Sequence, residues 1–135
     1  MAKSTGLGQT ALSVDDASGT PRDIRNDITN WQLSTPRGVQ DVTGVDKSAN
    51  ERLLLLADVS VTYNGVFNPA SNASHDVFKT VPSTSVGRVC TNTVNGVTLA
   101  PTCLFSDYQL TRADSGELTW SAPGALSNGV VPTWG

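Results

Sequence analysis

The side chains that could do chemistry are few, and their spacing matches no known active site. His75 is the single histidine, and no Gly-x-Ser-x-Gly turn is present that would place a serine nucleophile beside it. A zinc site takes about four Cys, His or carboxylate ligands in a characteristic spacing, and the chain offers one histidine and two cysteines. We therefore expect His75 to flank a short helix, and we predict no catalytic, metal-binding or cofactor-binding residue and no enzyme activity.

Acidic residues gather near the N-terminus, at Asp15, Asp16, Asp23 and Asp27. Carboxylates in a loop can bind calcium, but their spacing departs from the D-x-[DN]-x-[DN]-G pattern of a calcium loop. Aspartate is also an ordinary turn residue, because its side chain accepts hydrogen bonds from the backbone. We interpret these four as turn residues.

The two cysteines flank Asn95-Gly96, a strong signal for a tight hairpin. A two-residue turn would place Cys103 opposite Arg88 and make the cysteines diagonal neighbours. A four-residue loop would place Cys90 directly opposite Cys103. Either register brings the thiols close, as two buried reduced thiols or as a possible Cys90–Cys103 disulfide formed in an oxidising medium.

Composition excludes several classes of protein. Charged residues make up 16% of the 135-residue chain, and the net charge is −3. Glu and Lys are scarce, which disfavours a helical bundle, and the negative balance disfavours wrapping of nucleic acid. No apolar run approaches the roughly 20 residues of a membrane span. The N-terminus has no hydrophobic leader, so we expect folding in a cytoplasm.

The pattern along the chain predicts a mainly β protein, an antiparallel β-sandwich or barrel with one short flanking α-helix. Residues 1–135 are expected to form a single domain, with a flexible N-terminal arm at 1–9, irregular chain from 123 and a flexible C-terminal tail at 125–135. The helix is predicted at 74–81 with Ser74 as its N-cap. Strands are predicted at 10–14, 28–35, 53–67, 84–94, 97–111 and 117–122, with Trp31 and Trp120 in the core.

Two stretches stand out. Residues 36–51 read as a long connection, and loops beyond about 12–15 residues usually serve a purpose. From Leu53 to Tyr63 the odd positions are apolar throughout, which predicts one strand with a continuous apolar face. Ser48-Ala49-Asn50-Glu51 also fits a capping box that would open a helix, but the persistent alternation favours the strand.

An ordered set of segments resembles the major tail tube proteins of long-tailed (siphovirus-like) bacteriophages. The resemblance covers about residues 28–124 and is carried by DVTGVD at 41–46, ERL at 51–53, ADVSVTYNGVFN at 57–68, HDVFK at 75–79, FSDYQL at 105–110 and GELTWS at 116–121. It implies a structural protein of the virion tail, assembled in the host cytoplasm as homo-hexameric rings. The rings would stack into a tube with other tail proteins, and phage DNA would pass through its lumen without specific binding. No membrane is implied.

The resemblance also gives roles to particular segments. An open strand edge would pair with a neighbour and complete an inner barrel, and a six-chain ring at −3 per chain would carry −18, which would repel DNA. The connection would reach neighbouring subunits through Gln40, Asp41, Val42, Thr43, Gly44, Val45, Asp46 and Lys47. Two alternatives stay open: a β-sandwich module that binds a ligand through exposed Trp or Tyr, and another virion subunit such as a decoration or tail-terminator protein.

Overall fold

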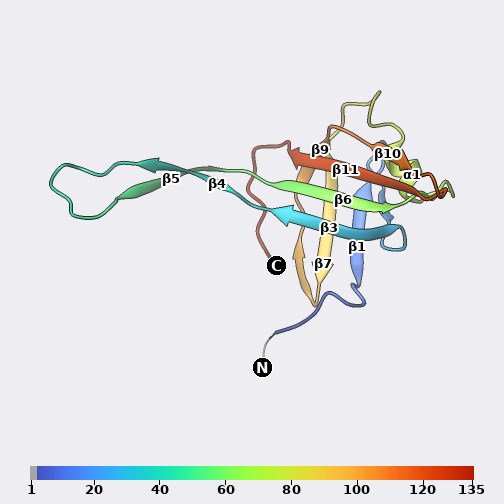
Figure 1. Ribbon diagram of the computed structural model, residues 1–135, viewed down its shortest axis with the longest axis horizontal. Coiled ribbons are helices and arrows are strands. Elements are labelled where there is room, and N and C mark those ends of the chain that lie inside the picture. Colours follow the sequence, from blue (N-terminus) through green and yellow to red (C-terminus); the bar gives the residue numbers. More distant parts are fainter. Residues whose placement is uncertain (1–2) are drawn as a thin grey trace.

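Strands dominate the computed structural model, which describes residues 3–135 (Figure 1). In that range the elements are β1 (Ala11–Asp15), β2 (Pro21–Asp23), β3 (Ile28–Ser34), β4 (Arg37–Asp41), β5 (Arg52–Ala57), β6 (Ser60–Val66), α1 (Ser74–Phe78), β7 (Arg88–Val94), β8 (Val97–Leu99), β9 (Thr102–Phe105), β10 (Gln109–Arg112) and β11 (Leu118–Leu126). The predicted fold class, mainly antiparallel β with one short helix, is confirmed.

The strands of the body belong to one hydrogen-bonded sheet that folds over itself. Its order is β2-β1-β7-β9-β11-β6-β3, with β10 joined to β11 and β8 joined to β7. Figure 1 shows β3, β6 and β11 running across β1 and β7, so the sheet makes two layers. We call β10, β11, β6 and β3 the front layer and β2, β1, β7 and β8 the back layer. β9 links the two layers, because it pairs with both β11 and β7.

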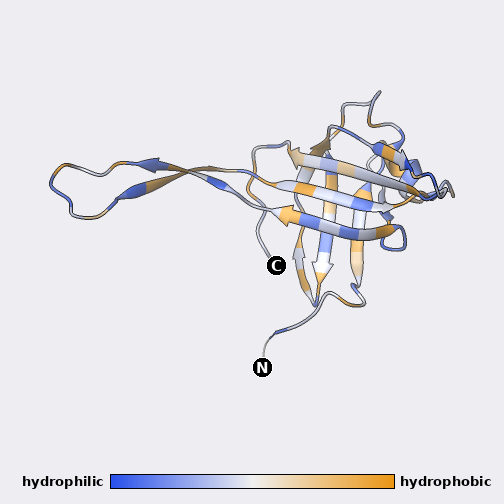
Figure 2. Cartoon of the chain, viewed as in Figure 1, coloured by the Kyte–Doolittle hydropathy of each residue, from blue (hydrophilic) through white to orange (hydrophobic). Residues whose placement is uncertain are grey.

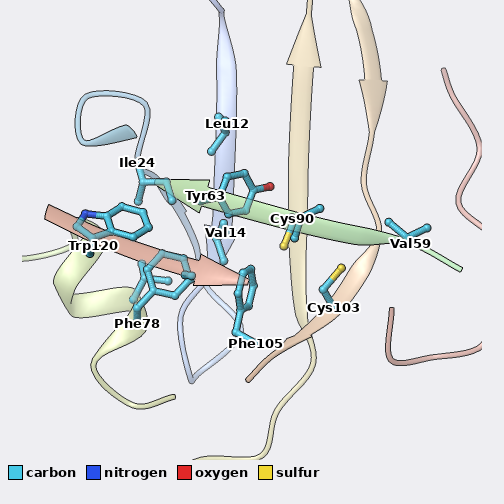
Figure 3. Packing of buried hydrophobic residues seen from close by; sticks show 13 residues of the cluster. Leu12, Val14, Ile24, Val59, Tyr63, Phe78, Cys90, Cys103, Phe105 and Trp120 are labelled. Carbon is cyan, nitrogen blue, oxygen red and sulfur yellow. The ribbon is translucent and has the colours of Figure 1, made fainter. Parts of the chain in front are cut away.

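The core fills the space between the layers (Figure 3). On β6, Val61 and Tyr63 are buried while Ser60 is exposed, so the predicted register of this strand is confirmed from Val59 to Tyr63. Tyr63 donates a hydrogen bond from its hydroxyl to Asn92 Oδ1 at 2.7 Å. The buried set comprises Leu12, Val14, Ile24, Val59, Val61, Tyr63, Val77, Phe78, Cys90, Cys103, Phe105, Trp120 and Ala122.

A close approach explains Gly65 in the middle of β6. A Cβ atom there would lie 2.1 Å from the Asp27 carbonyl oxygen and 2.8 Å from the Trp120 ring. Trp120 itself is buried, as predicted, and donates from Nε1 to the Val66 carbonyl at 3.0 Å. Glycine is therefore required for the indole to pack across β6.

A buried guanidinium joins the helix to the back layer. Arg88, at the start of β7, is 1% exposed. Its Nη1 donates to the carbonyl oxygens of Asp15 and Val77, each at 3.0 Å, and its Nη2 donates to Thr80 Oγ1 at 2.9 Å. The end of β1, the helix and the turn after it are thus held by one side chain.

The predicted strand over 53–67 is wrong in its first half. It divides into β5 and β6, and Leu53 and Leu55 are 55% and 46% exposed instead of lying in the core. The division falls at Asp58, whose N–H donates to the Pro36 carbonyl and whose Oδ1 accepts from the Val59 N–H. Only the residues after this point lie over the back layer, so only they are buried.

The predicted irregular connection over 36–51 is also corrected. Residues 37–41 form β4, which pairs with β5 and makes a two-stranded hairpin outside the main sheet. The alternative reading of residues 48–51 as a capping box that opens a helix is excluded, because the described residues 48–52 lie in the turn and at the start of β5. The chain therefore extends out from the body and returns as a β-hairpin.

Smaller boundaries shift for local reasons. The helix ends at Phe78, short of residue 81, and its N-cap is Ala73, so Ser74 is not the cap. The Ser74 N–H instead donates to Asp27 Oδ2 at 2.9 Å, and its hydroxyl has no partner within residues 3–135. β11 continues through Leu126, so the chain from 123 to 126 is not irregular. β2 lies between the strands predicted at 10–14 and 28–35, where no strand was predicted.

Both terminal segments contact the β7–β8 hairpin. Asn95 Nδ2 donates to Ser4 Oγ at 3.1 Å and to the Thr5 carbonyl at 2.6 Å. Thr98 and Gly135 exchange two backbone hydrogen bonds at 2.7 and 2.9 Å. The flexibility expected of 1–9 and 125–135 stays a prediction, as does the single-domain organisation.

We predict that Val61→Asp prevents folding. Val61 is 1% exposed, and an unpaired buried carboxylate costs several kcal/mol, a large part of a stability of about 5–15 kcal/mol. Ser60→Asp is the matched control, because its side chain points to the opposite face. Thermal unfolding followed by circular dichroism measures both; a folded Val61→Asp beside an unfolded Ser60→Asp would place the strand one residue out of register.

Candidate interaction surfaces

The hairpin of β4 and β5 projects from the body as an extended arm (Figure 1). We define the arm as residues 36–58. Its pairing runs from Asp41↔Arg52 through Gln40↔Leu53 to Val39↔Leu54, and a bulge follows before Arg37↔Ala57. Arg37 also donates from Nε to the Leu55 carbonyl at 3.0 Å. The arm is thus held by its own strand pairing.

The eight residues predicted to reach other subunits lie together at the outer end of this arm. Gln40 and Asp41 end β4, and Val42 to Lys47 form the turn. The structure therefore places these residues far from the core, where they are exposed or half-buried. Whether they contact another subunit stays a prediction.

Thr43 orders the base of this turn. Its N–H and hydroxyl donate to Asp41 Oδ1 at 2.9 and 2.5 Å, and its Oγ1 accepts from the Glu51 N–H at 2.8 Å. These hydrogen bonds from Thr43 lower the pKa of the Asp41 carboxyl below its usual value. The Val42 N–H closes the pairing on the Glu51 carbonyl at 2.9 Å, so the turn keeps a defined shape without support from the body.

The arm carries leucines on both of its faces. Leu54 lies opposite Val39, while Leu55 packs over Gly38, where a Cβ atom would lie 3.3 Å from Leu55 Cδ1. Exposure is 59% for Leu54 and 92% for Leu56, and Figure 2 shows the hydrophobic colouring of β5 outside the body. Contiguous exposed apolar surface of this kind marks an interaction site.

An open groove runs along the base of the arm. It is lined by Arg37, Leu54, Leu55, Leu56, Ala57 and Val131. Val131 comes from the C-terminal segment and is 58% exposed, so the apolar surface of the arm continues onto the body. Sequence analysis missed this surface by assigning the leucine run to the core. The available signal was that Leu54 and Leu56, at even positions, are as apolar as Leu53 and Leu55.

Two strand edges of the front layer are open. Within residues 3–135, β3 pairs only with β6, and β10 pairs only with β11. All four residues of β10 are exposed. Unpaired edges of this kind can form hydrogen bonds with a strand of another chain.

The other residues singled out by sequence are structural. Asp16 accepts hydrogen bonds from the N–H groups of Ser18 and Thr20, and Asp23 pairs with Arg25, as expected for turn residues. His75 lies within α1 and its Nδ1 is 3.2 Å from the Tyr108 hydroxyl. Within residues 3–135, no group of three or more His, Cys, Asp or Glu could hold a metal ion, and no helix there is long and apolar enough to cross a membrane.

Cys90 and Cys103 lie in β7 and β9 as diagonal neighbours. The two-residue turn is the one observed, with Val94 opposite Val97 and Arg88 opposite Cys103. Both thiols are buried (Figure 3), and a hydrogen bond to Cys103 together with burial raises the pKa of the Cys90 thiol. A diagonal pair is the less favourable geometry for bridging, and the disulfide stays a prediction.

We predict that the reduced thiols react with an aromatic disulfide reagent only after unfolding. Cys90 and Cys103 are each 0% exposed, and a thiol must reach the reagent as a thiolate. The absorbance of the aromatic thiolate that the reagent releases, recorded with and without denaturant, measures the reaction. A protein that has formed the disulfide would show no reactive thiol even when denatured and an intact mass lower by two hydrogens.

We predict that the double variant Leu54→Lys/Leu56→Lys unfolds at the same temperature as the original chain. Both side chains are more than half exposed, so their replacement removes little buried surface. Leu12→Lys, at a position 2% exposed, is the control that should unfold. A large fall in the midpoint for the double variant would mean that the arm contributes to the core.

Comparison with known proteins supplies the fold relationship. No protein-family model matches the chain, and no curated protein sequence matches it. The structure is similar to a chain from the tail of an empty gene transfer agent particle refined with C6 symmetry, with a TM-score of 0.73 and 15% identity over 98% of this chain and 99% of that one. It is similar also to a chain from the virion of a native gene transfer agent particle, with a TM-score of 0.69 and 13% identity over 98% and 99%. The chain therefore shares, over nearly its whole length, the fold of chains found in the tail and virion of a gene transfer agent.

Proposed function

We propose that this chain is a structural, non-enzymatic virion protein that forms homo-hexameric rings, stacked into a tail tube that conducts DNA. The observation that carries the proposal is the arm, whose leucines are exposed on both faces. The fold shared with a tail assembly of C6 symmetry supports the same conclusion. Other tail proteins would contact the ends of the tube, within a virion assembled in the host cytoplasm.

The arm supplies the contact between copies. Burying one leucine side chain contributes about 1.5–3 kcal/mol, and Leu53 to Leu56 are all at least 46% exposed in the single chain. A ring of six chains would repeat the contact six times. The arm also extends well beyond the body (Figure 1), so it can reach a second chain while its own body stays in place.

The open edges of the front layer supply a second contact. β3 of one chain and β10 of the next can pair edge to edge, because each already pairs with a strand on one side only within residues 3–135. Such pairing, repeated around a closed ring, makes a continuous barrel. The core covers one face of the front layer in each chain, so the opposite face of the front layer would line the lumen of this barrel.

The test is the assembly state of the purified chain. We expect six-fold rings or hollow tubes by negative-stain electron microscopy and a matching mass by sedimentation. A compact monomer at high concentration, also in the presence of the tail initiator complex, would overturn the proposal. A monomer whose Trp fluorescence responds to a glycan or peptide would support a ligand-binding module, and a single capping ring would support a tail-terminator subunit.

We predict that deletion of residues 44–48 blocks assembly and preserves the folded body. These residues form the outer turn of the arm, and the hydrogen bonds at its base involve Asp41, Thr43 and Glu51, which remain. Circular dichroism and sedimentation on the same sample measure fold and assembly. Val97→Ser is the control, because Val97 is an exposed apolar residue of the body (50%) and its loss should leave assembly intact. Normal assembly of the deletion variant would exclude a role for the turn.

A further inference from the structure

The outward face of the front layer carries no charged side chain. The chain has nine basic and twelve acidic residues, and none of them is at an outward position of β3, β6, β10 or β11. These positions hold hydroxyl and amide groups, apart from one valine, one proline and one alanine. We call this set the front face: Asn30, Gln32, Ser34, Ser60, Thr62, Asn64, Val66, Gln109, Thr111, Thr119, Ser121, Pro123 and Ala125.

Strand register makes these side chains one continuous surface. Gln109 lies opposite Ser121, Ser121 opposite Asn64, and Asn64 opposite Asn30, so a row of neutral polar groups crosses the whole layer. Asn64 Nδ2 donates to Asn30 Oδ1 at 2.7 Å. The next row places Thr62 between Pro123 and Gln32. The absence of charge therefore extends over the layer and is not confined to one strand.

The front face is unsuited to docking of an apolar partner. Its one large exposed apolar side chain is Val66, at the end of β6, whereas the arm carries a run of leucines. The other small hydroxyl and amide groups of the face hydrogen-bond readily to water. Its opposite side holds Val61, Tyr63 and Trp120 in the core, so the face cannot turn inward in the single chain. It is thus a polar and electrically neutral surface, with a shallow hollow between Asn30, Asn64 and Gln109.

We propose that the front face is the wall past which duplex nucleic acid moves, and that movement depends on the absence of fixed positive charge from this wall. Fixed cations would hold the phosphates, because each contact releases condensed counterions. Fixed carboxylates would repel them. Neutral hydroxyl and amide groups do neither, and the twelve acidic residues that give the chain its net charge of −3 lie elsewhere. The inference rests on the proposed function, since it needs a closed ring.

The test adds one charge to the face of an assembled tube. Thr62→Lys places six positive charges on each ring, and Gln109→Lys does so on a fully exposed strand, where folding is less at risk. Ser18→Lys is the matched control, with the same charge in the exposed turn between β1 and β2. Tubes are assembled with short duplex DNA, pelleted at low and moderate salt, and treated with nuclease.

We expect the original tubes to retain almost no DNA. Tubes of Thr62→Lys or Gln109→Lys should retain at least tenfold more at low salt, lose it as salt rises, and protect it from nuclease, because the DNA is enclosed. DNA retained by Ser18→Lys tubes should be digested. Thr62→Asp tubes should form and retain none.

Three results would overturn the inference while leaving the proposed function intact. DNA that is digested equally on Thr62→Lys and Ser18→Lys tubes would place the front face outside the tube. If the Thr62 and Gln109 variants fold but fail to assemble while Ser18→Lys assembles, the front face is a contact between subunits. Original tubes that retain protected DNA would show that a neutral wall does not release it. Failure of the original chain to form rings or tubes would instead overturn the proposed function.

Discussion

The buried guanidinium of Arg88 is the interaction on which the arrangement of the body depends. The guanidinium donates three hydrogen bonds to neutral oxygen atoms. Two of the acceptors are backbone carbonyls, on β1 and α1, and the third is the hydroxyl of Thr80 in the turn after the helix. A hydrogen bond from a charged donor contributes about 1.5–3 kcal/mol, and loss of the donor would leave buried acceptors unpaired. The helix is only five residues long, too short to be stable alone, so it is held by this side chain and by the burial of Val77 and Phe78.

A body fixed in this way leaves the arm free to serve a different purpose. The arm contributes no residue to the buried core, and its shape comes from strand pairing and from Thr43 at its turn. Its leucines are therefore available for contacts with other chains, while the neutral front face and the open edges lie on the body. The arm and the folding core are separated along the sequence, and they meet at Pro36 and Asp58, where a backbone hydrogen bond closes the base of the arm.

Sequence reasoning succeeded where short-range chemistry decides the structure. Asn95-Gly96 set the hairpin of β7 and β8, and alternation placed Val61 and Tyr63 in the core. The single strand predicted over 97–111 is wrong, because the chain divides there into β8, β9 and β10, at Pro101 and at residues 106–108. Sequence reasoning also failed where burial depends on what lies opposite. Leu53 and Val61 belong to one alternating pattern, but only Val61 faces the back layer. The role of Arg88 could not be foreseen either, because its acceptors come from segments 73 and 11 residues away. The connection over 36–51 was singled out by its length and by the resemblance, and its hairpin form was missed.

The exposed leucines of the arm also fix how its contacts respond to temperature and solvent. Burial of hydrocarbon near room temperature is driven by entropy and weakens on cooling, and sulfate or phosphate strengthens it. Contacts made by Leu53 to Leu56 should therefore loosen in the cold and tighten in such salts, whereas contacts between charged groups weaken as ionic strength rises. An assembly joined through this arm would dissociate in the cold, and it would be harder to disrupt with salt than with a mild detergent.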